Sequence, residues 1–192
     1  MIAVMAAAAL AGCLSPAPKA PVNWTISVVG EKSVARVDRK WDVVRISRVE
    51  VRSPYDGRSL AVLRPDGSLA FDPFNAFASA PSSILGGAAV DALSASGAAT
   101  SVVGPHSMAS VQTSIEVTVT RLALDCRKDG VREASVALSI TLLDGRRLVS
   151  VAEAEGGAAT PDGNYSAAFS AAFCKAFAEA LRSEERRVGK EC

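Results

Sequence analysis

The segment NYSAAFSAAFCKAFAEAL, residues Asn164–Leu181, repeats a large apolar side chain at every fourth position. A spacing of four keeps such side chains on one face of an α-helix, which then needs an apolar surface to cover it. The strands expected just before this segment offer that surface, so we expect the helix to pack on a β-sheet. The repeated positions are Phe169, Phe173, Phe177 and Leu181.

Alternating residues upstream of the helix predict the sheet. The apolar positions of VQTSIEVTV, residues 111–119, alternate with polar ones, which is typical of a strand with one buried face. The alternation changes phase after Arg121, which predicts a bulge or bend. It resumes in ASVALSITLL, residues 134–143, and Asp144-Gly145 then predicts a tight turn into RRLVSVAEA, residues 146–154.

The first half of the chain predicts further strands and a second helix. NWTISVVG (residues 23–30) and WDVVRISRVEVRSPY (residues 41–55) are rich in Val, Ile and Trp, as strands are. SLAVLRPDGSLAFDP, residues 59–73, predicts a hairpin, and within the stretch 74–97 we expect a helix with Pro81 in its first turn. The expected fold class is therefore α+β: one domain with a mainly antiparallel or mixed sheet and two main helices packed on it.

Composition narrows the classes of function. The chain has 192 residues, 49% of them hydrophobic, and a formal net charge of +1. It is long enough to bury a core as one domain. A nucleic-acid partner would call for a basic excess or a recognisable reading motif, and the sequence has neither. We expect no nucleic-acid partner.

The N-terminal segment has the features of an export signal that ends at a cysteine. Residues 1–12 are uncharged, apolar and too short to span a bilayer, which takes about 20 apolar residues. The sequence LAGC, Leu10–Cys13, is similar to the bacterial lipobox. That similarity implies cleavage before Cys13, acylation of Cys13 and stable attachment to a membrane by the acyl chains. The alternative is an ordinary cysteine in an N-terminal helix.

The two ends of the mature chain are expected to lie outside the fold. Residues 13–22 contain three prolines and predict a lipidated, semi-rigid tether. RSEERRVGKEC, residues 182–192, looks like the translation of a common sequencing-adapter oligonucleotide, and the alternative is a solvated helix end. We therefore expect a signal peptide at 1–12, the tether at 13–22, the domain at 23–181 and an adapter artefact at 182–192.

Two cysteines remain within the expected domain, Cys126 and Cys174. In an oxidising envelope compartment we expect them to form a disulfide that joins the last helix to a strand end. Two unpaired buried thiols are the alternative. No metal site is expected, because neither cysteine has a partner at ligand spacing and His106 is the single histidine.

No pattern of catalytic residues is present. A serine triad would have to use His106, and the chain contains no G-x-S-x-G turn and no phosphate-binding glycine loop. The carboxylates of Asp56, Asp66, Asp72 and Asp144 lie in turn sequences, where aspartates usually bond nearby backbone amides. We expect a protein that is not an enzyme and that carries no cofactor.

One segment carries a resemblance to a known family. PYDGRSLAVLRPDGSLAFDPFNAFASAPSSIL, residues 54–85, follows an extended lipoprotein leader, and NYSAAFSAAF, residues 164–173, closes the domain. Together they resemble the ABC-type transport auxiliary lipoproteins, the PqiC-like group of membrane-integrity lipoproteins associated with MCE proteins. The family's pattern is a hairpin followed by an aromatic-asparagine-aromatic stretch and a helix, and the positions that match it here are Phe71, Phe74, Asn75 and Phe77.

The resemblance implies a role in envelope lipid transport beside an MCE-domain protein, an ABC permease and an ATPase. Leu14 and Ser15 follow Cys13, and the absence of an aspartate there favours the periplasmic face of the outer membrane under the sorting rules of enteric lipoproteins. We expect docking through Tyr55, Arg58 and Arg64, although an ordinary solvated hairpin explains this segment equally well. The alternative function is an outer-membrane lipoprotein that activates a peptidoglycan synthase, which neighbouring genes would distinguish.

Overall fold

The computed structural model describes residues 20–28, 41–160 and 163–188, and their side chains as far as residue 183. The predicted signal peptide, Cys13 and most of the tether lie outside these residues. The elements are β1 (Val22–Trp24), β2 (Trp41–Val51), β3 (Ser59–Leu63), β4 (Leu69–Phe77), α1 (Pro81–Ser96), β5 (Ala99–Val103), β6 (Thr113–Asp125), β7 (Glu133–Asp144), β8 (Arg147–Ala159) and α2 (Tyr165–Val188).

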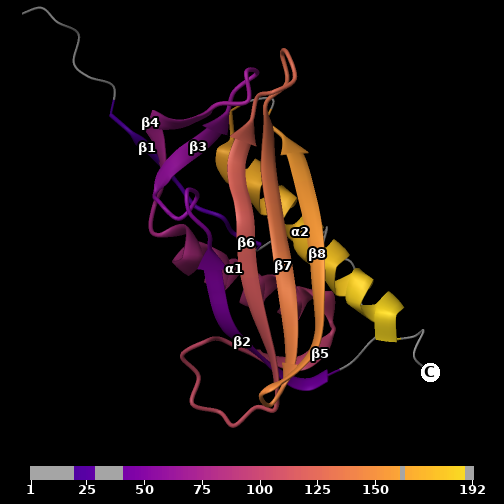
Figure 1. The fold of residues 1–192 in the computed structure, drawn as a ribbon. Helices are drawn as coiled ribbons and strands as arrows, with labels where there is room; N and C mark the ends of the chain where they lie inside the picture. Colours follow the sequence, from indigo (N-terminus) through magenta and orange to yellow (C-terminus); the bar gives the residue numbers. More distant parts are fainter. Residues whose placement is uncertain (1–19, 29–40, 161–162, 189–192) are drawn as a thin grey trace, which may run out of the picture.

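The eight described strands form one mixed sheet around β6 (Figure 1). One edge of β6 pairs with β7 along its whole length, and β8 continues the sheet on that side, both antiparallel. The other edge of β6 is shared by two strands. β2 runs parallel to its first half, Thr113–Val119, and β3 runs parallel to its last residues, Ala123–Asp125. β4 and β1 extend the sheet beyond β3, and β5 extends it beyond β2.

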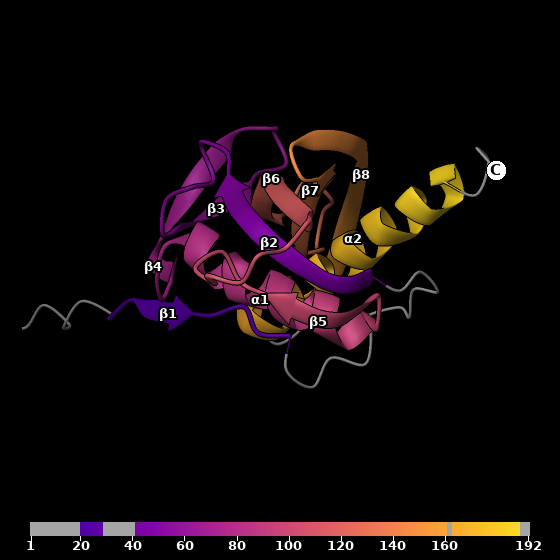
Figure 2. The ribbon, with the colours of Figure 1, turned by 90° about the horizontal axis from the view of Figure 1, so that it is seen from below.

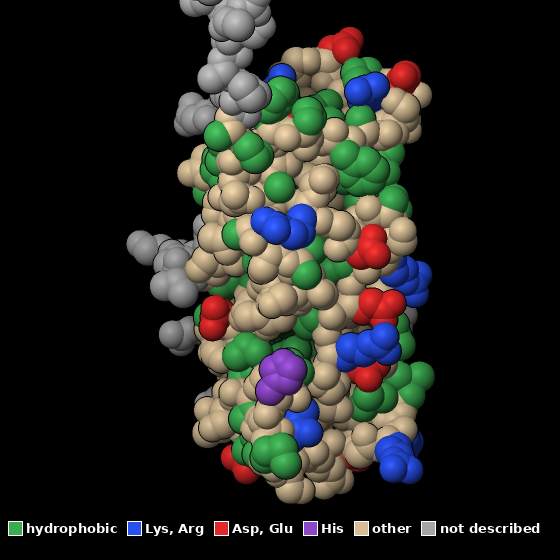
Figure 3. All heavy atoms as spheres, turned by 90° about the vertical axis from the view of Figure 1, so that its left-hand side faces the viewer, with side chains coloured by type: hydrophobic (Ala, Val, Ile, Leu, Met, Phe, Trp, Pro, Cys, Tyr) green, Lys and Arg blue, Asp and Glu red, His purple; other side chains and the backbone are tan. Residues whose placement is uncertain are grey.

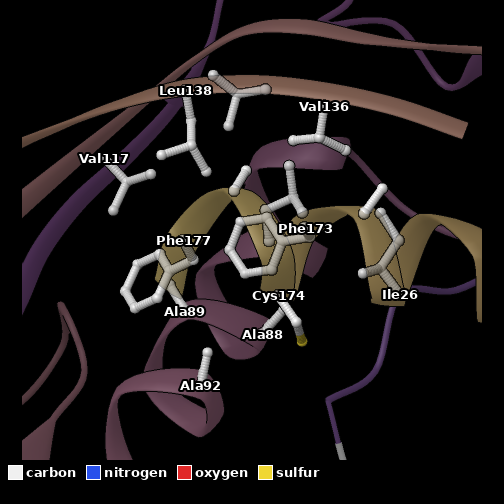
Figure 4. Close-up of a cluster of buried hydrophobic side chains, with 14 of the residues drawn as sticks. Ile26, Ala88, Ala89, Ala92, Val117, Val136, Leu138, Phe173, Cys174 and Phe177 are labelled. Atoms are coloured by element: carbon white, nitrogen blue, oxygen red, sulfur yellow. The ribbon is translucent and has the colours of Figure 1, made fainter. Parts of the chain in front are cut away.

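Both helices cover the same face of the sheet and contact each other (Figures 1 and 2). α2 packs on β7 and β8, whereas α1 packs on β2 and β5. The large side chains spaced by four on α2 are all buried at 2% exposure or less, so they are the centre of the core. Figure 4 shows Phe173 of α2 directed towards Val136 and Leu138 of β7. This arrangement confirms the predicted α+β class.

The predicted turns and irregularities agree with the structure at several points. The register between β6 and β7 shifts between Val119 and Arg121, where the change of phase predicted a bulge. Gly145 turns β7 into β8 with φ +59, as the Asp-Gly pair predicted. Gly97 ends α1 in the left-handed conformation, with its N–H donating to the Ser94 carbonyl. A glycine accepts this conformation without steric cost.

Two segments differ from the prediction. β5 was not predicted, and the strand expected over residues 23–30 ends at Trp24. Residues 25–28 instead run beside α2, where the Ser27 N–H donates to Ser170 Oγ at 3.0 Å and Ser166 Oγ donates to the Thr25 carbonyl at 2.6 Å. Ile26 and Val28 are buried there, so their apolar character serves packing on a helix and not pairing in a sheet.

Candidate docking surface

The β3–β4 hairpin, in the region that resembles the transport family, is held by several side-chain hydrogen bonds. Its turn is held by Asp66, whose Oδ1 accepts the N–H of Ser68 at 2.9 Å and the hydroxyl of Ser68 at 2.6 Å. The Ser68 hydroxyl bond holds the pKa of the exposed Asp66 carboxyl below its usual value. Gly67 supplies the positive φ of +81 that the turn requires. The tip of the hairpin is therefore ordered by its own side chains.

β4 bulges strongly within its pairing to β3. Ala61 pairs with Phe71, and Ser59 pairs with Ala76, so residues 72–75 have no pairing partners in β3. Asp72 holds this bulge. Its Oδ1 accepts the backbone N–H groups of Phe74 and Asn75 at 2.8 and 3.1 Å, and its Oδ2 accepts the Asn75 side-chain amide at 2.8 Å. An aspartate commonly organises a turn in this way.

Asn75 connects the bulge to β1. Its Oδ1 accepts the indole N–H of Trp24 at 2.8 Å, while the backbone of Asn75 lies opposite Val22 in the parallel pairing of β1 with β4. The asparagine of the family-like stretch therefore ties three segments together: β1, the bulge and the end of β4. The aromatic residue that follows, Phe77, is 2% exposed and packs edge-to-face on Phe169 of α2 at 5.6 Å.

Arg58 has a structural role in the same region. Its Nε donates to the Phe77 carbonyl at 2.9 Å, and its Nη2 donates to Asn23 Oδ1 at 3.2 Å. The Arg58 carbonyl in turn accepts the Phe77 N–H at 2.7 Å. Arg58 therefore links the start of β3 to the end of β4 and to β1, although its side chain lies at the surface.

The three residues predicted to bind a partner have different environments. Tyr55 is half-buried and packs against the core, and its N–H donates to the Arg52 carbonyl at 2.9 Å. Arg58 is engaged in the contacts just described. Arg64 is exposed and begins the turn of the hairpin, with its backbone N–H donating to Ser68. Of the three, Arg64 therefore has the position best suited to contact another molecule.

Two phenylalanines on β4 are exposed, and this exposure was not predicted from the sequence. Phe71 is 49% exposed and Phe74 is 48% exposed, and Val22 of the neighbouring strand is 43% exposed. Single exposed apolar side chains are common on protein surfaces, but several on neighbouring strands indicate a contact site. Burial of these side chains against a partner would be favourable. The signal that could have revealed them is Pro73, because a proline inside a strand indicates an edge or a bulge.

Two shallow grooves lie elsewhere on the surface. One, of about 590 Å3, runs between α1 and the end of β5, and its lining includes Val49, Gly86, Gly87, Val90 and His106. A Cβ at Gly86 or Gly87 would meet no atom within 4 Å, so no other part of the described chain packs on α1 at these two glycines. Figure 3 shows the face that carries this groove, with the histidine in purple.

The second groove, of about 470 Å3, lies between the ends of β6 and β8 and includes Cys126, Lys128 and Arg132. Burial raises the pKa of the Cys126 thiol, which suppresses the reactive thiolate. At the same end of β6, Asp125 and Arg127 form an ion pair of 2.6 Å. The hydrogen bond from Arg127 holds the pKa of the Asp125 carboxyl below its usual value.

The expected disulfide is not present: no bond joins Cys126 to Cys174. Cys126 follows the last residue of β6 and is partly exposed, with its N–H donating to the Leu63 carbonyl of β3 at 2.9 Å. Cys174 is fully buried, and Figure 4 shows it beside Ala88, on the side of α2 that faces α1 and away from β7. The prediction was wrong because the phenylalanine face of α2, and not its cysteine, packs on the sheet.

Two features of the described residues concern membranes and metal ions. No helix among residues 20–28, 41–160 and 163–188 is long and apolar enough to cross a membrane. In the same part of the chain, no three His, Cys, Asp or Glu side chains lie together in a way that could hold a metal ion.

Solved structures with the same fold are known. A protein of Xanthomonas campestris described with the family model DUF330 superposes with a TM-score of 0.59 at 17% sequence identity, over 89% of this chain and 98% of that one. The chain shares its fold. A second structure, of a protein described as uncharacterized, gives a TM-score of 0.51 at 17% identity, over 90% of this chain and 97% of that one. No protein-family model and no curated protein matches the sequence.

Proposed function

We propose that this chain is a lipid-anchored auxiliary lipoprotein of the ABC-type transport group. In this role it docks onto an MCE-domain protein that works with an ABC permease and an ATPase in envelope lipid transport. The anchor is the acylated Cys13, and the domain faces the periplasm from the outer membrane. The chain contributes contacts and positioning to the assembly, carries no cofactor and catalyses no reaction.

The observation that carries this proposal is the ordered β3–β4 hairpin at the point where the tether enters the fold. β1 begins at Val22, the last residue of the predicted tether, and pairs with β4. Hydrogen bonds that Trp24 and Arg58 donate and that Asp72 accepts fix the hairpin, so its exposed side chains are presented without a large entropic cost on binding. The fold shared with the DUF330 protein and the LAGC sequence support the same interpretation.

Docking is assigned to the tip of this hairpin. Arg64 is the exposed basic residue there, and a guanidinium suits an acidic or polar partner surface. The half-buried Tyr55 lies outside the hairpin, in the connection between β2 and β3. Arg58 is reassigned to a structural role, so its substitution is expected to loosen the hairpin and affect docking indirectly.

The partner is tested by affinity capture of the lipidated full chain from its native envelope, followed by mass spectrometry. Recovery of an MCE-domain protein with its permease and ATPase is the expected result. Arg64→Glu should reduce that recovery, whereas Arg146→Glu, at the exposed β7–β8 turn, should leave it unchanged. Equal recovery with both variants would contradict the assigned surface. Recovery of a peptidoglycan synthase without any MCE protein would favour the alternative function.

The anchor is tested independently of any partner. The intact mass of the protein purified from membranes should show an N-terminal Cys13 carrying its acyl groups. Density fractionation of the envelope should place the protein with outer-membrane markers. A mature protein that carries no acyl group would contradict the anchor, and its co-sedimentation with inner-membrane markers would contradict the location.

A further inference from the structure

Three of the eight exposed large apolar side chains among the described residues lie on the neighbouring strands β1 and β4, near the point where the chain enters the fold. Phe71 and Phe74 of β4 and Val22 of β1 are each between 43% and 49% exposed, and we call these three residues the aromatic corner. β1 pairs with β4 only from Asn75 to Phe77, so among the described strands none covers the outer edge of β4 before Asn75. Figure 3 shows the left-hand side of the molecule as drawn in Figure 1. Hydrophobic side chains lie at the surface in its upper part, where Figure 1 places β3 and β4.

The exposure of Phe74 is maintained by specific contacts. The bulge that carries it is closed by three hydrogen bonds to the Asp72 carboxylate, two of them from the backbone N–H groups of Phe74 and Asn75. Asp72 is the acidic residue next to the aromatic corner, and its carboxylate already accepts these three hydrogen bonds within the fold. Because the Asp72 carboxylate does not depend on hydrogen-bond donors from a partner, the exposed apolar side chains beside it suit a partner that is itself apolar.

The tether limits what can lie opposite the aromatic corner. Cys13 precedes Val22 by nine residues, so the chain between them spans at most about 30 Å even when fully extended. The domain itself is longer, since a strand of 13 residues such as β8 extends about 43 Å. Once Cys13 is acylated, the aromatic corner is the part of the domain that the tether holds nearest to the bilayer.

We propose that the aromatic corner contacts the lipid bilayer, with Phe71, Phe74 and Val22 seated in the interfacial region of the membrane. Aromatic and aliphatic side chains on a fixed surface gain free energy when they are buried among lipid headgroups and acyl chains. The contact adds a second attachment to the acyl anchor and sets the orientation of the domain relative to the membrane. This inference rests on the lipid anchor of the proposed function, not on the choice of protein partner.

The test uses acylated full-length protein in vesicles of phosphatidylethanolamine and phosphatidylglycerol, with and without brominated acyl chains, which quench tryptophan fluorescence on contact. Phe74→Trp places the probe in the aromatic corner. The matched control is Leu148→Trp, because Leu148 is also exposed, at 56%, but lies at the other end of the sheet, where β8 begins. The unsubstituted protein gives the background from Trp24 and Trp41, and thermal unfolding shows that each variant is folded.

We expect the Phe74→Trp emission to shift to the blue and to be quenched by the brominated vesicles, while the Leu148→Trp emission changes no more than the background. Equal quenching of the two variants in acylated, vesicle-bound protein would overturn the bilayer contact and leave the anchor intact. Absence of quenching together with a blue shift that depends on protein concentration would assign the corner to a second copy of the chain. Absence of acylation at Cys13 by intact mass would overturn both proposals together.

Discussion

Replacement of Gly156 by alanine tests how closely α2 must approach the sheet. Gly156 lies in β8, and a Cβ built there would lie 2.7 Å from the Ala176 nitrogen and closer still to the Ala172 carbonyl oxygen, both in the backbone of α2. Ordinary contact begins at 3.4 Å, so the Ala176 nitrogen alone requires the helix to retreat by about 0.7 Å, and the Ala172 oxygen requires more. No side-chain rotation can relieve a clash with backbone atoms.

The energetic effect of Gly156→Ala follows from this displacement. Overpacking of a close-packed interior costs about 1–3 kcal/mol, and we expect the upper end of that range because the whole phenylalanine face of α2 must move. For a domain of this size each kcal/mol lowers the melting temperature by about 2–4 °C, so the expected loss is about 6–12 °C. The measurement is thermal unfolding followed by circular dichroism.

The neighbouring residue provides a matched control. A Cβ at Gly157 would clash with the Glu133 carboxylate, which is the free end of a flexible side chain and can turn aside. Alanine reduces the conformational freedom of the unfolded chain relative to glycine, so Gly157→Ala should change stability by less than about 1 kcal/mol in either direction. Equal melting temperatures for the Gly156→Ala and Gly157→Ala proteins would refute the reasoning from close approach.

Three further predictions follow from the core, the ion pair and the thiols. Phe173→Ala should cost about 3–5 kcal/mol in urea unfolding, because Phe173 is completely buried; a loss below about 1 kcal/mol would contradict its place in the core. Asp125 has a lowered pKa in the folded state, so its pairing with Arg127 stabilises the fold above the carboxyl's ordinary pKa of about 3.9 and is lost as the pH falls through the lower folded value. Asp125→Asn should therefore lower the melting temperature slightly at neutral pH and leave it unchanged near pH 2, and a difference that grows on acidification would contradict this sign. Alkylation of unreduced, denatured protein followed by peptide mapping should label both Cys126 and Cys174. A disulfide-linked pair of peptides that contain these two residues would contradict this prediction and support the disulfide.

The elements with clear periodicity could be predicted from the sequence. The spacing of four in α2 and the alternation in β6 and β7 depend on residues that face one core, so pattern and structure agree. The bulge in β6 could be predicted for the same reason, because a shift of one residue moves every following side chain to the other face.

The remaining features depend on contacts between distant segments. β5 is a short strand whose pairing with β2 carries no periodic signal. The segment at Ile26 has the composition of a strand but packs beside α2, a choice that only the complete fold determines. The cysteine pairing failed because two thiols were matched by elimination, without knowledge of which side of α2 faces the sheet.

In the candidate docking surface, the sequence indicated the segment but not the role of each residue. Arg58 was expected at a partner interface, yet it bonds the Phe77 carbonyl and Asn23. An exposed arginine in a turn sequence does not reveal whether its donors already have acceptors within the fold. Phe71 and Phe74 could not be separated from the buried Phe77 by composition alone, since the bulge at Asp72 decides which ring points outwards.

The sharing of one edge of β6 between β2 and β3 has a consequence for the order in which the molecule can fold. Until residues 113–125 have been synthesised, the described strands before them can form only two small separate groups, β1–β4–β3 and β2–β5. Sheets of so few strands are barely stable in water by themselves, and only the β2–β5 group has a helix from the first half, α1, packed on it. Contacts between residues this far apart in sequence also form slowly. The two groups of strands from the first half of the chain therefore join into one sheet only when β6 is present to pair with both of them.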